Sequence, residues 1–214
     1  MSDNSAINKL LGISAEIGQD RLPLSVNVSN NMGHLKEEFE NILDVKNGFI
    51  AFESALQFFH SGDGQDYIDI NIWNEPSLWI DQYSKNAQQY AFFAQDLFGN
   101  QFIVYDSAIY TFEPETEKIE YMADNFESWA EKILADYEFF TGHPLASEWQ
   151  IQNGPIKKNM RLIPKIPFVC DGAFKIDNLF ESEAVKSMRF RAYFSKQIKD
   201  LPDGAKIEFE FSSI

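Results

Sequence analysis

The most constraining feature of this sequence is the stretch from Tyr90 to Tyr121, which holds four short runs of aromatic and β-branched residues. Within each run the large apolar residues recur at every second position, as in Phe102 and Val104, which is the period of a β-strand. Turn-forming residues such as Gly99 and Pro114 separate the runs. Connections this short join antiparallel neighbours. The stretch therefore predicts a four-stranded antiparallel meander at the centre of the fold.

Length and composition favour one domain over the whole chain, residues 1–214. A hydrophobic content of 44% is enough to form a substantial core at this length. No Pro-, Gly- or Ser-rich linker divides the sequence, and no segment recurs at a fixed period.

Apolar residues at helical spacing precede the meander twice. The first set, with charged residues on its opposite side, predicts an amphipathic helix that ends near Asn47 and Gly48. The second set predicts a further helix that ends at Ser61 and Gly62. We expect both helices to cover one face of the sheet. The two sets are Leu35, Phe39, Ile42 and Leu43, followed by Phe52, Ala55, Leu56 and Phe59.

A longer apolar stripe follows the meander, from Phe126 to Tyr137, and predicts the clearest helix of the chain. Asp124 is suited to cap its N-terminus, with Glu127 three residues later completing a capping box. Gly142 is suited to its C-terminal cap. A further helix is expected from Pro144 to the Asn153-Gly154 pair.

Two tryptophans in the region before the meander admit two interpretations. Trp73 precedes a Pro76 that is suited to the first turn of a short helix carrying Trp79. The pair could form a recognition surface, but aromatic residues beside a sheet more often belong to the core. We therefore expect both indole rings to be buried.

The two ends of the chain are less regular. Residues 7–14 suggest a short helix, and residues 22–28 an extended segment. Two prolines exclude residues 161–168 from a central strand, so we expect an extended segment that is held by its apolar side chains. A helix over 181–199 and a half-buried strand over 205–211 complete the predicted fold.

The balance of charge limits the possible partners. The formal net charge is -15, from 33 acidic and 18 basic residues. Such a field disfavours nucleic acids and anionic membranes, and it accelerates the encounter with a basic partner. A single cysteine indicates a reducing compartment, and neither a signal peptide nor a run of 18 apolar residues occurs. We expect a soluble cytoplasmic protein.

The sequence contains no motif that would place a catalytic group, a metal or a cofactor. His34, His60 and His143 are isolated, and we expect them at surface or capping positions. Cys170 has an apolar neighbourhood typical of a buried thiol. The loop 60–66 lacks carboxylates at the first and twelfth positions that an EF-hand calcium loop requires. We therefore predict no metal and no cofactor. An enzyme stays an alternative that would need a cleft in which titratable groups with shifted pKa values converge.

Acidic residues gather at three places in the sequence, and each group is most simply explained as a solvated face. Together they could dock a protein surface rich in lysine and arginine, and we expect the first group to be exposed. The candidate partner-binding residues are Glu113, Glu115 and Glu117 at a turn of the meander, Asp63, Asp66 and Asp69 in a loop, and Glu37 and Glu38 on a helix.

The order of these elements resembles the SUKH superfamily, which includes fungal regulators of cell-wall glucan synthesis and bacterial immunity proteins of polymorphic toxin systems. The similarity spans about residues 35–150, and its motifs are signatures of turns and core positions. The matching pieces are Asn47-Gly48-Phe49 before Phe52-Glu53-Ser54-Ala55-Leu56, Trp73-Asn74, Trp79, the block from Phe92 to Phe102, the turn from Tyr110 to Thr116, and Trp129.

The resemblance implies an α+β domain with a central antiparallel meander sheet flanked by helices and without catalysis. Residues 1–34 would be a divergent N-terminal extension, and residues 155–214 a C-terminal extension that ends in a strand. The bacterial members are intracellular antidotes that bind a toxin domain, often a nuclease, encoded nearby. This implies an immunity protein for a basic toxin domain; the alternative is an interaction scaffold that regulates cell-wall or envelope synthesis.

Overall fold

A seven-stranded antiparallel sheet organises the computed structural model, which describes residues 5–64, 66–202 and 204–205. The strands follow one another in chain order across the sheet, so every neighbour pair is a sequential connection. The fold is therefore α+β, and the predicted four-stranded meander is confirmed as its last four strands. The strands are β1 (Ala15–Glu16), β2 (Phe49–Ala51), β3 (Leu56–Phe58), β4 (Ala91–Gln95), β5 (Gln101–Tyr105), β6 (Ala108–Glu113) and β7 (Lys118–Ala123).

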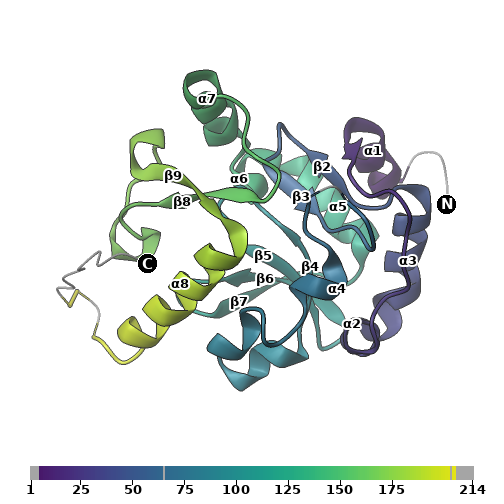
Figure 1. The fold of residues 1–214 in the computed structure, drawn as a ribbon, viewed down its shortest axis with the longest axis horizontal. Helices are drawn as coiled ribbons and strands as arrows, with labels where there is room; N and C mark the ends of the chain where they lie inside the picture. The colour runs from purple at the N-terminus through teal and green to yellow at the C-terminus, as the bar shows by residue number, and fades with distance from the viewer. Residues whose placement is uncertain (1–4, 65, 203, 206–214) are drawn as a thin grey trace.

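Helices cover both faces of this sheet, and a separate two-stranded hairpin stands beside it. In Figure 1 the hairpin and α8 lie at one end of the molecule, while α1 and α3 lie at the other. The helices are α1 (Ala6–Ile13), α2 (Val26–Met32), α3 (Lys36–Val45), α4 (Ile70–Trp73), α5 (Phe126–Ala135), α6 (Tyr137–Thr141), α7 (His143–Asn153) and α8 (Ala184–Ile198). The hairpin pairs β8 (Met160–Pro164) with β9 (Leu179–Glu183).

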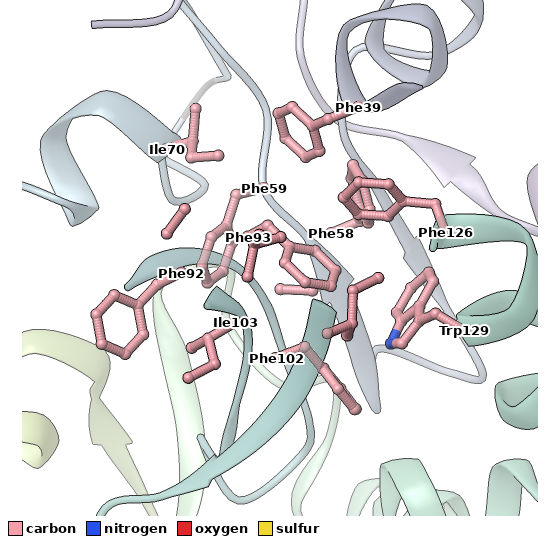
Figure 2. Close-up of a cluster of buried hydrophobic side chains, with 14 of the residues drawn as sticks. Phe39, Phe58, Phe59, Ile70, Phe92, Phe93, Phe102, Ile103, Phe126 and Trp129 are labelled. Carbon is pink, nitrogen blue, oxygen red and sulfur yellow. The ribbon is translucent and has the colours of Figure 1, made fainter. Parts of the chain in front are cut away.

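The face of the sheet beneath α3 and α5 is packed almost entirely with aromatic rings. Figure 2 shows Phe126 and Trp129 of α5 directed at side chains of the strands. The Trp129 ring centroid lies 5.7 Å from that of Phe102 and 5.4 Å from that of Phe93. Phe39 of α3 stacks at 5.2 Å on Phe58 of β3. These contacts fix α3 and α5 against the middle of the sheet.

The opposite face is covered by the segment from α4 to β4 and by α8. Phe92 points to this side because it neighbours Phe93 on the same strand, and its ring packs at 4.7 Å from that of Trp79. Trp73 and Trp79 are both buried, which confirms that they belong to the core. The Tyr83 hydroxyl donates to the Met188 carbonyl of α8 at 3.0 Å. After Pro76 the chain forms turns and the 3₁₀ helices η2 (Ile80–Gln82) and η3 (Lys85–Gln89).

The helix predicted over Phe52 to Phe59 is wrong, because this segment is the hairpin of β2 and β3. Both faces of these strands are buried, so the apolar residues do not alternate with polar ones and their spacing imitates a helix. The backbone reverses through Phe52, Glu53 and Ser54, whose φ angles are 51°, 53° and 70°. Gln150 of α7 braces the turn by donating to the Glu53 carbonyl at 2.8 Å.

The helix after the meander ends earlier than predicted and has a different N-cap. Asn125, not Asp124, accepts a hydrogen bond from the Ser128 N–H. Glu127 does not complete a capping box, since its carboxylate accepts from the N–H groups of Ala6 and Ile7 at the start of α1. The chain breaks at Asp136, which caps α6, and Gly142 ends that helix with a φ of 73°.

The predictions for the two chain ends are mixed. The short helix is present as α1, but residues 26–28 belong to α2, so the extended segment over 22–28 is wrong. Residues 160–164 stay out of the central sheet and form β8 instead, and α8 begins at Ala184 because residues 179–183 are β9. Residues 206–211 of the predicted strand over 205–211 lie outside the described residues. None of the described helices is long and apolar enough to cross a membrane.

Candidate functional site

A groove of about 560 Å³ lies on the part of the sheet that α5 leaves uncovered. Phe102 packs against α5, and cross-strand pairing places Thr111 and Glu120 on the same face as Phe102. These side chains form the floor of the groove. Side chains of α6 and of residues 168–174 form its walls. Pockets of this size hold a drug-sized molecule or a few residues of a peptide.

Large apolar side chains stand exposed around this groove. Their exposed fractions are 77% for Phe139, 63% for Phe174, 56% for Tyr121 and 46% for Val169. Isolated exposed apolar residues are ordinary, but several around one hollow mark a place where another molecule binds. The ring of Phe174 stacks on the ring of Phe168 with 3.9 Å between their centroids, and both rings line the groove.

The groove is also acidic. Four carboxylates and two lysines line it, namely Asp96, Glu113, Glu115 and Glu120 against Lys118 and Lys132. Lys118 pairs with Glu120 at 2.5 Å on the strand surface. Lys132 donates to the Met122 carbonyl and lies over the Tyr121 ring. The lining therefore carries a net negative charge when all these groups are ionised.

The three glutamates of the β6–β7 turn are placed together, but the prediction that they are exposed is wrong. Glu113 closes the turn by accepting from the N–H groups of Glu115 and Thr116. Glu115 is buried, with 4% of its surface exposed, and its Oε2 accepts from the Val169 N–H. Glu117 points to the other side of the sheet, where it accepts from the Ser84 N–H and the Ser195 hydroxyl. All three hold the fold together.

A row of buried glutamines crosses the sheet next to the groove. Gln57, Gln95 and Gln101 are paired across β3, β4 and β5. The Trp73 indole N–H donates to Gln101 Oε1 at 2.9 Å, and Arg161 of β8 donates to Gln57 Oε1. Desolvation lowers the pKa of Arg161 to about 10. The row therefore anchors the β8–β9 hairpin to the central sheet.

Asp96 closes the turn between β4 and β5 at the inner end of the groove. Its Oδ1 accepts from the N–H groups of Phe98 and Asn100, and its Oδ2 accepts from the Asn100 amide, each at 2.8 Å. Burial raises the pKa of Asp96 to about 7, against the hydrogen bonds from Asn100 and the charge of Arg191. Arg191 of α8 donates to the Phe98 carbonyl of the same turn, and its Nη1 is buried with no hydrogen-bond partner among the described residues.

The other predicted acidic residues lie outside the groove. Asp63 and Asp66 are exposed in the loop before α4. Asp69 caps α4 by accepting from the Ile72 N–H at 2.8 Å. Glu37 is exposed on α3, whereas Glu38 is half-buried and accepts from the Glu127 N–H. Burial raises the pKa of Glu38.

The histidines and the cysteine do not gather at the groove in the way a reactive centre requires. His60 is buried, so its predicted surface or capping position is wrong; its Nε2 lies 3.2 Å from the Tyr67 carbonyl oxygen. Cys170 is half-buried rather than buried, and desolvation raises the pKa of its thiol. Across residues 5–64, 66–202 and 204–205, no three His, Cys, Asp or Glu side chains are placed to hold a metal ion.

Sequence reasoning missed the residues that make the groove distinctive. Phe139 and Phe140 follow the helix predicted from Phe126 to Tyr137, and the sequence suggests that this helix continues through them. The break between the two helices at Asp136 has no strong sequence signal. Phe174 lies in a segment without regular structure, where no periodicity predicts exposure. The one available signal was Gly142, a helix-ending residue that placed a boundary shortly after Phe140.

No protein-family model matches the sequence, and no curated protein sequence matches it. Among solved structures, the chain is similar to the crystal structure of Atu4351 from Agrobacterium tumefaciens, at 12% sequence identity and a TM-score of 0.60. The alignment covers 89% of this chain and 88% of the other. A likeness at this identity concerns the fold alone.

Proposed function

We propose that the protein is a non-catalytic binding protein and that its groove receives a basic protein partner. The observation that carries this proposal is the combination of Phe139, Phe174, Tyr121 and Val169, all exposed, around a hollow in which carboxylates outnumber lysines. Exposed apolar area supplies the affinity of a protein contact, and the charge selects a partner of opposite sign.

The whole chain supports the same choice of partner. A net charge of -15 attracts a basic protein from a distance, which raises the association rate at low salt. The groove concentrates part of this charge at apolar surface, where a contact would be formed. A nucleic acid partner is disfavoured for the same electrostatic reason.

A catalytic use of the groove is less well supported than a binding use. The carboxyl oxygens of Asp96 already accept three hydrogen bonds from their own turn. Glu113 and Glu115 are likewise bonded to backbone N–H groups. These carboxyl groups therefore serve the structure in the arrangement described.

The finer proposal is that the partner is a toxin domain and that the protein is its immunity protein, acting in the cytoplasm. It rests on the resemblance of residues 35–150 to the SUKH superfamily, together with the acidic groove. A toxin that binds nucleic acid carries a basic surface where it meets phosphate, and an acidic protein can cover that surface.

The test is binding to the product of the adjacent gene, produced as an inactive variant. Calorimetry should show a 1:1 complex, and stopped-flow mixing should show an association rate that falls as salt rises. Phe139→Ala should weaken the complex, while Tyr193→Ala, an exposed aromatic of α8 outside the groove, should not. Several partners without protection against a toxin would favour the regulatory scaffold instead. Binding that neither salt nor Phe139→Ala affects would contradict the groove as the contact surface.

A further inference from the structure

We propose that the groove is a receptor for an arginine side chain, carried on a short segment of the partner. This inference rests on the proposed function, because it specifies which basic group the groove selects. Its basis is that exposed aromatic rings and the exposed Glu120 carboxylate line the same groove.

The first wall offers an aromatic face of defined orientation. The rings of Phe168 and Phe174 are stacked nearly parallel, with 5° between their planes, and Phe98 packs edge-on against both at 5.2 Å and 6.0 Å. One face of Phe174 is thus used by Phe168, and the ring remains 63% exposed at the groove. A ring held in this way loses little conformational freedom when a planar group stacks on its other face.

The second wall is aromatic as well. Phe139 of α6 is the most exposed ring of the groove, and its centroid lies 5.1 Å from that of Phe140 in an edge-on arrangement. Both residues line the same hollow as Phe174. A side chain that enters the hollow therefore meets aromatic rings from two separate segments of the chain.

The floor supplies the acceptor. Glu120 projects from β7, its side chain is 63% exposed, and its Oε1 is paired with Lys118 of the same strand. An exposed pair of this kind contributes little to stability, so a competing cation can replace Lys118 at small cost. A carboxylate beneath aromatic walls is the environment in which a cation can stack and be neutralised together.

Arginine fits this environment better than lysine. The guanidinium is planar, weakly hydrated on its faces, and donates five N–H groups in its plane, so it can stack on Phe174 and bond Glu120 at once. The lysine ammonium is compact and strongly hydrated, and it would have to lose water between the aromatic walls. The volume of about 560 Å³ also admits the residues that flank the arginine.

The experiment uses the full ¹⁵N-labelled chain and three capped peptides that differ at one position in a glycine-rich host, with arginine, lysine or neutral citrulline there. Amide shifts should change in residues 139–140 and 168–174. The arginine peptide should bind about fivefold more tightly than the lysine peptide, and the citrulline peptide more weakly than the arginine peptide.

Variants then locate the contact. Phe174→Leu keeps an apolar side chain without an aromatic face and should weaken arginine binding about fivefold, and Phe174→Ala should do the same. Glu120→Gln should reduce the preference for arginine over citrulline. Tyr193→Ala is the matched control, because Tyr193 is 64% exposed but lies outside the groove. The unchanged spectrum of each variant away from residue 174 or 120 verifies that it is folded.

Two results separate this inference from the proposed function. Arginine peptides that bind in the groove although no basic protein partner exists would support the receptor and overturn the function. A basic partner whose affinity is the same for the wild type, Phe174→Leu and Phe174→Ala would support the function and overturn the receptor. Equal binding of the arginine and citrulline peptides would also overturn the receptor.

Discussion

The carboxylate of Glu115 accepts a hydrogen bond from the Val169 N–H at 3.1 Å, so the turn between β6 and β7 holds the far wall of the groove. The wall is otherwise braced within itself, because Asn178 accepts from the Ile166 N–H and donates to the carbonyls of Ile166 and Ala173. Glu115 is thereby a link between the sheet and the wall, and its predicted role as an exposed partner contact does not fit its burial.

Charge reversal at Glu115 is expected to destabilise the fold. Glu115→Lys removes the acceptor for Val169 and places a cation in the interior, where Arg191 interacts with residue 115. We expect a loss of about 3 to 5 kcal/mol in the free energy of unfolding, measured by urea denaturation. Glu120→Lys, on the exposed strand surface, should stay within about 0.5 kcal/mol. Equal stability of the two variants would contradict the buried position of Glu115.

The pH dependence of stability should carry a contribution from Asp96. Its pKa is about 7 in the folded protein, above the ordinary value of 3.8, so between these values the native state keeps a proton that the unfolded state has lost. Asp96 therefore stabilises the fold less as pH rises through this window, by at most about 1.4 kcal/mol per pH unit.

Asp96→Asn is the variant that isolates this contribution. An asparagine at position 96 can still accept from the Phe98 and Asn100 N–H groups, but it does not titrate. The loss of stability between about pH 5 and about pH 8 should be smaller in this variant than in the wild type by about 2 kcal/mol. Parallel stability curves for the two proteins would show that Asp96 titrates at its ordinary pKa.

The parts of the fold that the sequence predicts are those with a clear local signal, either turn residues between short apolar runs or a single apolar stripe on a helix. β4 and β5 are buried at nearly every position, and β6 and β7 mix buried and exposed residues without strict alternation, but turn residues such as Gly99 and Pro114 separate the four runs. α3 and α5 carry one apolar stripe each, so their periodicity identified them. The hairpin of β2 and β3 is buried on both faces and has a turn in left-handed conformation without glycine. Neither property leaves a local signal, and tertiary packing decides the outcome.

The site was less predictable because its residues come from segments that meet only in the folded chain. Glu113 and Glu115 were identified from sequence, but their burial depends on the loop 165–178, more than 50 positions away. Phe139 and Phe174 line one groove and lie 35 positions apart with no shared motif. The net negative charge of the whole chain did indicate the sign of the charge that lines the groove.

The two-residue turn between β5 and β6 offers a test of backbone strain. Asp106 and Ser107 have φ angles of 46° and 67°, which is the type I′ arrangement that favours glycine at the second position. Ser107→Gly should stabilise the protein by about 0.5 to 1 kcal/mol in urea denaturation. The control is Ser84→Gly at a φ of -65°, where the same change should destabilise. Stabilisation by both substitutions would rule out relief of strain at residue 107.

Arg191 should support the fold in a way that depends on pH. Its charge lowers the pKa of both Asp96 and Glu115, against the burial that raises them. In Arg191→Met these two carboxyl groups lose the cation, so their pKa values rise further and the native state binds still more protons at neutral pH. Stability then falls more steeply with rising pH, because the unfolded state has already released those protons.

We expect Arg191→Met to lose more free energy of unfolding at about pH 8 than at about pH 5. The control is Arg189→Met, at an exposed position of α8, which should lose similar amounts at both pH values. A loss for Arg191→Met that is the same at both pH values would mean that the guanidinium acts through packing and its bond to the Phe98 carbonyl, and not through the two carboxyl groups.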